Sequence, residues 1–222
     1  MKHILIIASY GPSLINFRLP LIKRLLSRGY KVSVASPIDD FSDILQKKLQ
    51  DLGIYINIFK LSRTRFNLLI NFNSLIELYK IVKNSKPNII ISYTAKPVIF
   101  SGLVLKFFKK VSYYPLITGL GFSFTEINSI KKIFFRYLIS QLYRQGLKSS
   151  KKIIFQNKDD QSLFYKLKIL DQSKISYVIN GSGVDLSEYP LTNLPSKRVF
   201  LMIARLLGDK GVREYVNAAK IV

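Results

Sequence analysis

Short apolar segments alternate with longer amphipathic segments along most of this chain. Apolar strands without polar alternation are typical of a parallel sheet that helices cover on both faces. Because crossovers between parallel strands are right-handed, the pattern predicts an α/β fold, a doubly wound, Rossmann-like domain over residues 1–183. The apolar segments, in order, are 3–9, 31–36, 54–59, 88–93, 111–118, 151–156 and 175–181.

Local signals agree with helices between these strands. Gly29 and Gly53 follow two amphipathic segments and predict helix C-caps. Asn73 precedes a third and is expected to act as its N-cap.

The pattern changes after residue 183. Residues 184–196 contain Pro190 and Pro195 and are interpreted as a linker. Residues 197–222 then restart the alternation with an apolar segment, "VFLMIA", and an amphipathic one, "VREYVNAAKIV". Since one strand and one helix cannot form a core, this segment is expected to be the first strand and helix of an incomplete, C-terminally truncated second Rossmann-like domain.

Composition excludes several kinds of chemistry. The chain has no cysteine and one histidine, His3, within the first predicted strand. Thiol catalysis, a cysteine zinc site and a histidine-dependent triad are therefore not expected. No pair of carboxylates follows the strands, so we expect no metal and no cofactor.

Charge indicates the kind of partner. The chain has 35 Lys and Arg against 13 Asp and Glu, a net charge of +22, and residues 1–38 contain no acid. Such a surface favours an anionic partner: membrane lipid, nucleic acid or a phosphorylated substrate. The sequence has no apolar run long enough to predict a transmembrane helix.

Ligands of doubly wound folds bind beyond the carboxyl ends of the strands, which selects candidate residues. The turn at Gly11 precedes a helix whose amino end would favour an anion, although "SYGPS" is not GxGxxG and an ordinary tight turn also explains it. The candidates for a ligand-binding cleft are Tyr10, Gly11, Pro12, Asn16, Tyr93, Thr94, Lys96, Thr118, Gly119, Gly121, Asn180 and Gly181, with Ser13, Gln156, Asn157 and Ser182 beside them.

Two further cations lie at a predicted strand-to-helix turn near the end of the chain. Arg205 and Lys210 fall within "ARLLGDKG". Cations at such a turn can neutralise the developing charge of a phosphate leaving group.

One predicted helix, residues 130–148, mixes cations with aromatic residues. A basic amphipathic helix binds anionic membranes, and we expect this one to do so. An ordinary sheet-covering helix with a solvated face is the alternative, and binding of single-stranded nucleic acid is a more distant one. The expected membrane residues are Lys131, Lys132, Phe134, Phe135, Arg136 and Arg144.

Five segments carry a distinctive combination of glycine, proline and charged residues: "SYTAKPVIFSGL", "ITGLGFSF", "IIFQNKDDQSLF", "VINGSGVDLSEYP" and "IARLLGDKGVREYVNAAK". In these segments the chain resembles the N-terminal portion of GT-B fold, family-4 retaining glycosyltransferases. The resemblance covers essentially all 222 residues. It is strongest to the group that transfers N-acetylated sugars to undecaprenyl-diphosphate-linked saccharides.

The resemblance implies a UDP-sugar donor, a polyprenyl-diphosphate-linked acceptor, no metal and no nucleic acid. It implies that Arg205 and Lys210 bind the donor diphosphate and stabilise the leaving group. The transfer would proceed by front-side attack, with retention of the anomeric configuration. It also implies that the loop at Gly11, Lys96 and the Gly119–Gly121 loop line the cleft. The protein would then act in the cytoplasm, peripheral on the inner face of the cell membrane.

The chain departs from the family in two respects. Thr118 stands where many members have a histidine, and the Glu-x7-Glu motif of the family would lie beyond Val222. We therefore expect little or no transferase activity from this chain alone. The alternative is a non-catalytic, membrane-bound acceptor-binding module that depends on a separate donor half.

Overall fold

The computed structural model describes residues 1–37, 43–62, 68–120, 124, 130–187, 189–204, 206 and 208–221, without the side chains of residues 44, 45, 68–70, 132 and 209. The chain divides into two units, Met1–Asp185 and Leu186–Val222, which are described separately below.

The first unit is built on one parallel sheet of seven strands in the order β3-β2-β1-β4-β5-β6-β7. All seven expected strands are present, and every pair is parallel. The strands are β1 (His3–Ile7), β2 (Lys31–Ser36), β3 (Tyr55–Ile58), β4 (Ile89–Tyr93), β5 (Ser112–Ile117), β6 (Ile153–Phe155) and β7 (Ser176–Val178).

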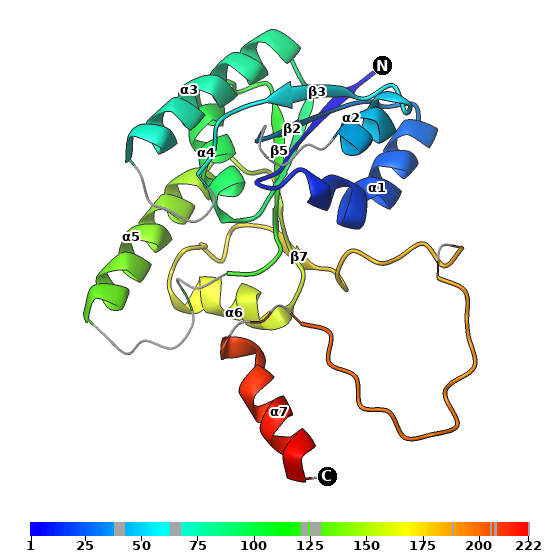
Figure 1. The fold of residues 1–222 in the computed structure, drawn as a ribbon. Coiled ribbons are helices and arrows are strands. Elements are labelled where there is room, and N and C mark those ends of the chain that lie inside the picture. Colours follow the sequence, from blue (N-terminus) through cyan, green and yellow to red (C-terminus); the bar gives the residue numbers. More distant parts are fainter. Residues whose placement is uncertain are drawn as a thin grey trace. The chain divides into compact units, whose positions relative to one another are not determined.

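Helices connect the strands and cover both faces of the sheet, with α1 and α2 on one side and α3, α4 and α5 on the other (Figure 1). Their bounds are α1 Pro12–Ser27, α2 Asp43–Gln50, α3 Leu68–Ser85, α4 Ala95–Val104, the 3-10 helix η2 Leu105–Phe107, α5 Ile130–Leu147 and α6 Lys158–Lys166. The doubly wound α/β prediction is therefore confirmed.

Two apolar cores fill the space between the sheet and its two helical layers. Alternate residues of β1 enter opposite cores, because successive strand side chains point to opposite faces. Ile4 and Ile6 pack with α1 and α2, whereas Leu5 and Ile7 pack with α3, α4, α5 and α6. Both faces of the central strands are thus buried, as the continuous apolar segments predict.

Of the two expectations about the ends of helices, the C-caps are confirmed and the N-cap is wrong. Gly29 and Gly53 have φ angles of 77° and 69°, so they terminate their helices in the left-handed region as expected. Asn73, expected as an N-cap, lies inside α3, which begins at Leu68. That expectation was wrong because the apolar residues before Asn73 extend the helix by more than a turn.

The second unit contains the 3-10 helix η4 (Gly208–Lys210) and α7 (Val212–Ile221). The expected helix is confirmed, but residues 199–204 form no strand. A strand exists only through hydrogen bonds to a neighbouring strand, and these residues have none. The Tyr215 hydroxyl instead donates to the carbonyl of Phe200 at 2.9 Å.

Helices α4 and α5 approach each other closely at two glycines. A Cβ on Gly102 would lie 1.9 Å from the carbonyl oxygen of Gly146, and one on Gly146 would lie 2.9 Å from the carbonyl oxygen of Ile99. Backbone in both positions leaves no room for a methyl group. The two glycines therefore set the distance between α4 and α5.

Replacing Gly102 by Ala tests this contact. In an unconstrained helix the change would stabilise the protein by about 1 kcal/mol. Here we expect the free energy of unfolding to fall by about 3 kcal/mol, because the helices must separate to admit the methyl group. Urea unfolding of Gly102→Ala and of the less crowded Gly146→Ala measures the effect, and a stabilised Gly102→Ala would contradict the packing described.

Candidate functional site

The sheet has a topological switch point between β1 and β4. The two strands are adjacent and parallel, and the helices that follow them, α1 and α4, lie on opposite faces of the sheet. Nothing in this connectivity covers the carboxyl ends of the two strands. Ligands of open α/β sheets bind at such a point, which makes it the candidate site.

Three contacts tie the two strand ends together. Thr94, directly after β4, donates its hydroxyl to Ser9, two residues after the end of β1, at 2.7 Å. The hydroxyls of Ser13 and Tyr93 are 2.8 Å apart. The guanidinium carbon of Arg18 lies 4.6 Å from the centre of the Tyr93 ring. Of the residues predicted after the first and fourth strands, Ser13, Tyr93 and Thr94 are therefore brought to one place.

The amino ends of α1 and α4 both open at this place. Gly11 and Thr94 are their N-caps, and neither provides a side-chain hydrogen bond to the helix. Both helices are fully described, and neither has an acidic residue in its first turn. The helix dipole makes each end attractive to an anion, although at α1 Pro12 has no amide proton and the amides of Ser13 and Leu14 already donate to the carbonyls of Tyr10 and Gly11.

Thr94 has a strained backbone. Its φ of 67° and ψ of 158° lie in a region that residues with a Cβ rarely occupy. Such strain costs about 1–3 kcal/mol and persists only where the surroundings enforce it. At Thr94 the hydrogen bond to Ser9 and the start of α4 enforce it, so the conformation belongs to the architecture of the site.

Arg18 is buried beneath the site, with 5% of its surface exposed. Its Nη1 donates to the carbonyl of Phe17 at 3.0 Å and to the hydroxyl of Ser182 at 2.5 Å. Its Nε is buried without a hydrogen-bond partner. Burial lowers the pKa of Arg18, and the nearby Tyr93 raises it by a smaller amount.

Lys96 lies in the first turn of α4 and is half-buried. Its ammonium group donates to the carbonyl of Ser62 in the segment after β3. Burial lowers the pKa of this amine. Lys96 thus places a cation in the first turn of α4, where the helix dipole disfavours one.

The other predicted residues are distributed around the same edge. Asn16 is exposed on α1, and Thr118 and Gly119 follow β5, with Gly119 at a φ of 145°. Asn180 and Gly181 follow β7 in a turn, where the amide of Gly181 donates to the carbonyl of Ile179. Between described side chains, no hydrogen bond joins any of these five residues to Tyr93 or Thr94.

The remaining predicted residues cannot be assigned to the site. Gly121 and Arg205 lie outside the described residues. Lys210 is exposed at the end of η4 in the second unit. The roles given to Arg205 and Lys210 therefore stay predictions.

Sequence reasoning missed Arg18, which is not among the predicted cleft residues. The signal was present, because Leu14, Arg18 and Ile22 are four residues apart and share one face of the helix. All three are buried. A cation in the middle of an apolar i, i+4 stripe predicts burial better than the local density of charge does.

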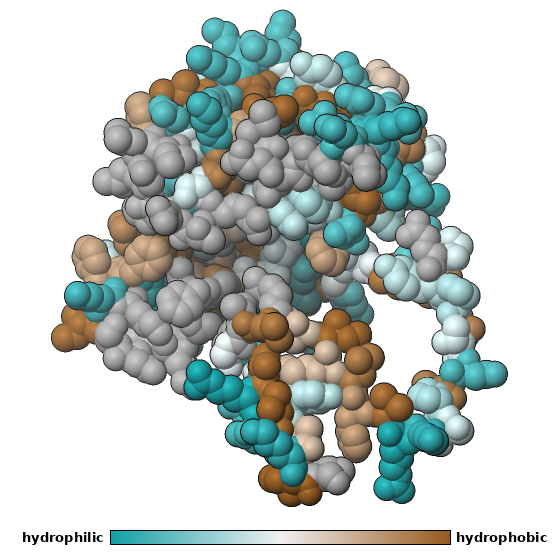
Figure 2. Space-filling model, in the orientation of Figure 1, coloured by the Kyte–Doolittle hydropathy of each residue, from teal (hydrophilic) through white to brown (hydrophobic). Residues whose placement is uncertain are grey.

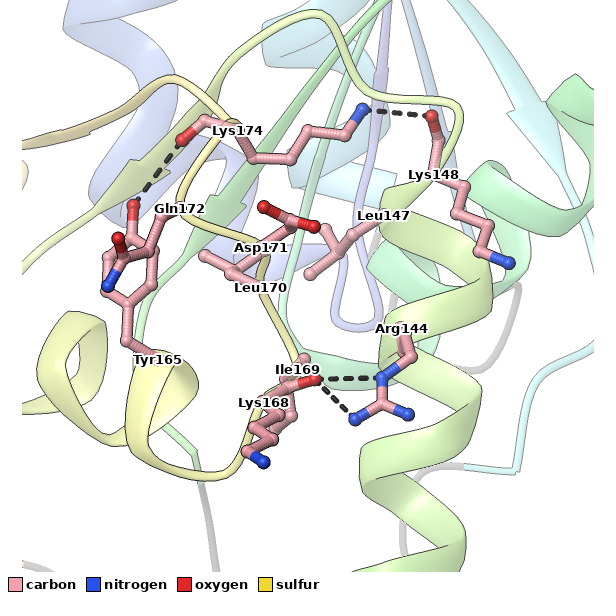
Figure 3. A pocket seen from close by; sticks show the side chains of 10 residues that line it. All are labelled: Arg144, Leu147, Lys148, Tyr165, Lys168, Ile169, Leu170, Asp171, Gln172 and Lys174. Carbon is pink, nitrogen blue, oxygen red and sulfur yellow. Dashed lines mark hydrogen bonds between the residues drawn. The ribbon is translucent and has the colours of Figure 1, made fainter.

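A cavity of about 570 Å³ lies at the opposite, amino edge of the sheet. As Figure 3 shows, it is lined by the last turns of α5 and α6 and the segment before β7. Arg144 donates to the carbonyl of Lys168, and Lys174 to those of Lys148 and Ser150 at 3.1 Å. These cations are used to join chain segments, so we do not assign the functional site here.

Comparison with known proteins shows the family of the chain. The sequence pattern of the family described as Glycosyl transferase 4-like matches residues 3–157. The chain belongs to this family. The matched region includes β1, β4 and the helices that follow them, which together form the switch point.

Two curated relatives are longer than the chain. N,N'-diacetylbacillosaminyl-diphospho-undecaprenol alpha-1,3-N-acetylgalactosaminyltransferase of Campylobacter jejuni is 30% identical over 96% of this chain and 58% of its own length. UDP-Gal:alpha-D-GlcNAc-diphosphoundecaprenol alpha-1,3-galactosyltransferase of Escherichia coli is 27% identical over 70% of this chain and 42% of its own length. The chain thus spans about half the length of the curated relatives it matches.

Solved structures share the fold at low sequence identity. MurG of Acinetobacter baumannii aligns with 86% of this chain and 48% of its own, at a TM-score of 0.53 and 13% identity. The UDP co-structure of MnaA from S. aureus aligns with 89% of this chain and 50% of its own, at a TM-score of 0.56 and 18% identity. These similarities support the Rossmann-like fold of the first unit.

The buried Tyr93 hydroxyl predicts how stability depends on alkaline pH. Burial raises the pKa of Tyr93 from 10.0 to about 12. The unfolded chain then releases this proton near pH 10 while the folded chain keeps it, so stability is lost as pH rises from 10 to 12. We expect Tyr93→Phe to make the decline shallower by up to about 1.4 kcal/mol per pH unit.

Urea unfolding between pH 9 and pH 11.5 measures this slope. Burial also raises the pKa of Tyr113 and Tyr143, so part of the decline persists in the variant. Tyr137→Phe, which removes a hydroxyl from an exposed ring, is the control and should leave the slope unchanged. Equal slopes for Tyr93→Phe and the wild type would show that Tyr93 titrates normally in the folded protein.

Proposed function

We propose that this chain acts in a glycosyltransferase that moves a sugar from a UDP-sugar to a polyprenyl-diphosphate-linked saccharide. The observation that carries the proposal is the 30% identity, over 96% of the chain, to a relative named for transfer to such a lipid-linked acceptor. The positive switch-point site supports it, because donor and acceptor both carry diphosphate groups.

The chemistry we propose depends on positioning and charge. Arg205 and Lys210 would stabilise the departing UDP, and the switch point would hold the acceptor side of the reaction. Retention would follow from attack of the acceptor hydroxyl on the face that the UDP leaves, without a covalent enzyme intermediate. We also propose that the reaction needs no divalent metal.

Transfer of a labelled sugar tests the proposal. Two proteins are assayed. One is this chain alone, and the other is this chain joined to the C-terminal part of the C. jejuni relative that extends beyond the alignment. Donors are UDP-N-acetylgalactosamine, UDP-N-acetylglucosamine and UDP-galactose, and the acceptor is an undecaprenyl-diphosphate saccharide, with and without EDTA. We expect a longer lipid-linked saccharide from the joined protein, and Lys210→Ala to lower kcat roughly 100-fold.

Lys220→Ala removes another exposed cation of the second unit and serves as the matched control. It should leave kcat within twofold of the parent. A folded joined protein that makes no product from any donor, while the C. jejuni relative does so in parallel, would count against the proposed function.

We further propose that α5 docks the protein peripherally on the anionic inner face of the cell membrane. Ile130, Ile133, Phe134 and Tyr137 are spaced as one helix face and are 84%, 51%, 69% and 62% exposed. Exposed apolar residues of this size are unusual on a solvated helix. Figure 2 shows hydrophobic residues beside hydrophilic ones over this end of α5.

The expected cations of α5 differ in their surroundings. Lys131 is exposed and Arg136 is half-buried, both near the apolar face. Phe135 is half-buried, the side chain of Lys132 is not described, and Arg144 is bound to the carbonyl of Lys168. The proposed surface is therefore the first half of the helix. Among the helices that the structure describes, none is long and apolar enough to span a bilayer.

Flotation with liposomes tests this surface. We expect the chain to float with vesicles that contain anionic lipid, less with neutral vesicles, and less as salt rises. Phe134→Ser should weaken binding roughly tenfold, because it removes the burial of one aromatic side chain.

Phe72→Ser, an equally exposed phenylalanine on α3, is the control and should bind as the wild type does. A competitor oligonucleotide is included to detect nucleic-acid binding. Equal losses in the two variants would show that α5 has no special role at the membrane.

A further inference from the structure

We propose that Arg18 is the side chain that binds a phosphate oxygen of a diphosphate ligand at the amino ends of α1 and α4. The inference rests on the proposed function, whose donor and acceptor both contain a diphosphate, and it assigns a residue to that shared group. Arg18 was not among the candidate cleft residues that the sequence indicated.

The first argument is the cost of burying an unpaired charge. A guanidinium stays charged at any pH that proteins tolerate. Buried cations are normally matched by a carboxylate, because desolvation is otherwise not offset. Within the described part of the chain Arg18 contacts only neutral acceptors, the carbonyl of Phe17 and the hydroxyl of Ser182. Its buried Nε has no acceptor at all.

The second argument is position. The guanidinium lies over the ring of Tyr93, whose hydroxyl bonds to Ser13 in the first turn of α1. Tyr93 is followed at once by Thr94, the N-cap of α4. The cation of Arg18, on α1, is therefore held against the last residue of β4, two residues before α4 begins.

The third argument is the number of positive groups. The planar guanidinium can take two oxygens at once, and the dipoles of the two helix amino ends add positive potential beside it. Two helix ends and one arginine exceed what a single carboxylate would neutralise. A diphosphate supplies two adjacent anionic groups and matches this arrangement.

The hydrogen bond from Arg18 to Ser182 does not oppose such binding. The Ser182 hydroxyl also accepts from Nε2 of Gln156 at 3.2 Å. The Ser182 hydroxyl therefore still accepts a hydrogen bond from Gln156 when the guanidinium turns toward a ligand. The exchange replaces a neutral acceptor by a charged one, which forms the stronger hydrogen bond.

Calorimetric titration of residues 1–222 tests the assignment. The probes are farnesyl diphosphate, inorganic pyrophosphate and UDP, each without sugar transfer. We expect Arg18→Met to weaken binding of the diphosphate probe roughly tenfold or more, as the loss of a charged hydrogen bond predicts. Arg18→Lys should lie between Arg18→Met and the wild type, since it keeps the charge without the planar fork.

Arg24→Met is the matched control, because it removes an exposed arginine from the same helix. It should change the affinity by less than twofold. Stronger binding of farnesyl diphosphate than of UDP identifies the acceptor as the source of the diphosphate, and the reverse order identifies the donor. Either order supports the proposal if Arg18→Met weakens the binding.

Ser182→Ala distinguishes ligand binding by Arg18 from a purely structural role of Arg18. It removes the hydrogen bond between Arg18 and Ser182 and keeps the guanidinium. If Arg18 only holds the segment after β7, both variants lower Tm and leave the affinity of the folded protein unchanged, which overturns the proposal. Under the proposal Ser182→Ala binds at least as tightly as the wild type. Absence of binding by the wild type, or equal losses in Arg18→Met and Arg24→Met, also overturns it.

These outcomes are independent of the transfer assay. If transfer occurs and Arg18→Met binds normally, the assignment of Arg18 fails while the proposed function stands. If transfer is absent but binding depends on Arg18, the proposed function fails and the site binds a diphosphate for another purpose.

Discussion

The parallel pairing of β1 with β4 determines the position of the candidate ligand-binding site in this protein. Along Ile4–Ile7 and Ile89–Ser92 the two strands share one ladder, yet the helices that follow them cover opposite faces of the sheet. Their carboxyl ends are left between two diverging helices. Both helices begin there, so both direct the positive ends of their dipoles to the same place.

The positive potential at the carboxyl ends of β1 and β4 follows from the lack of acidic residues there. Neither α1 nor α4 has an acid in its first turn, and Lys96 and Arg18 add positive charge beside them. In the absence of a ligand these groups repel one another, and the burial of Arg18 adds a desolvation cost. A protein that retains such an arrangement, together with the strain at Thr94, gives up stability at its site. An anionic ligand would recover part of it.

The sequence predicted the fold well because periodicity reports burial directly. All seven strands and the two-sided helical cover followed from apolar segments such as those at β1 and β4. The strand at 199–204 was wrong because composition cannot say whether a pairing partner exists. Among site residues, Tyr10, Gly11 and Thr94 were predicted from the strand-end rule, which depends only on chain order.

Arg18 was missed for a different reason. Its position depends on tertiary contacts with Tyr93 and with Ser182, which is 164 residues away in the chain. Local charge density suggested a surface residue, whereas packing decided otherwise. The same limit applies to α5, where Tyr143 is buried and Phe134 is exposed although both are aromatic residues of one helix.

The two halves of α5 have different environments, and this difference would connect the proposed membrane surface to the site. The last turns are held against α4 by Gly102 and Gly146, so the helix is anchored at the amino edge of the sheet. A helix that connects parallel strands begins at the carboxyl edge, so the exposed Ile133 and Phe134 lie toward the edge that carries the switch point. A lipid-linked diphosphate approaching from a bilayer bound to this half of α5 would therefore meet the edge where the amino ends of α1 and α4 open. The close contact at Gly102 and Gly146 fixes the direction of α5. Because of that direction, membrane binding by the exposed apolar face would bring the lipid surface to the edge of the sheet that carries the site.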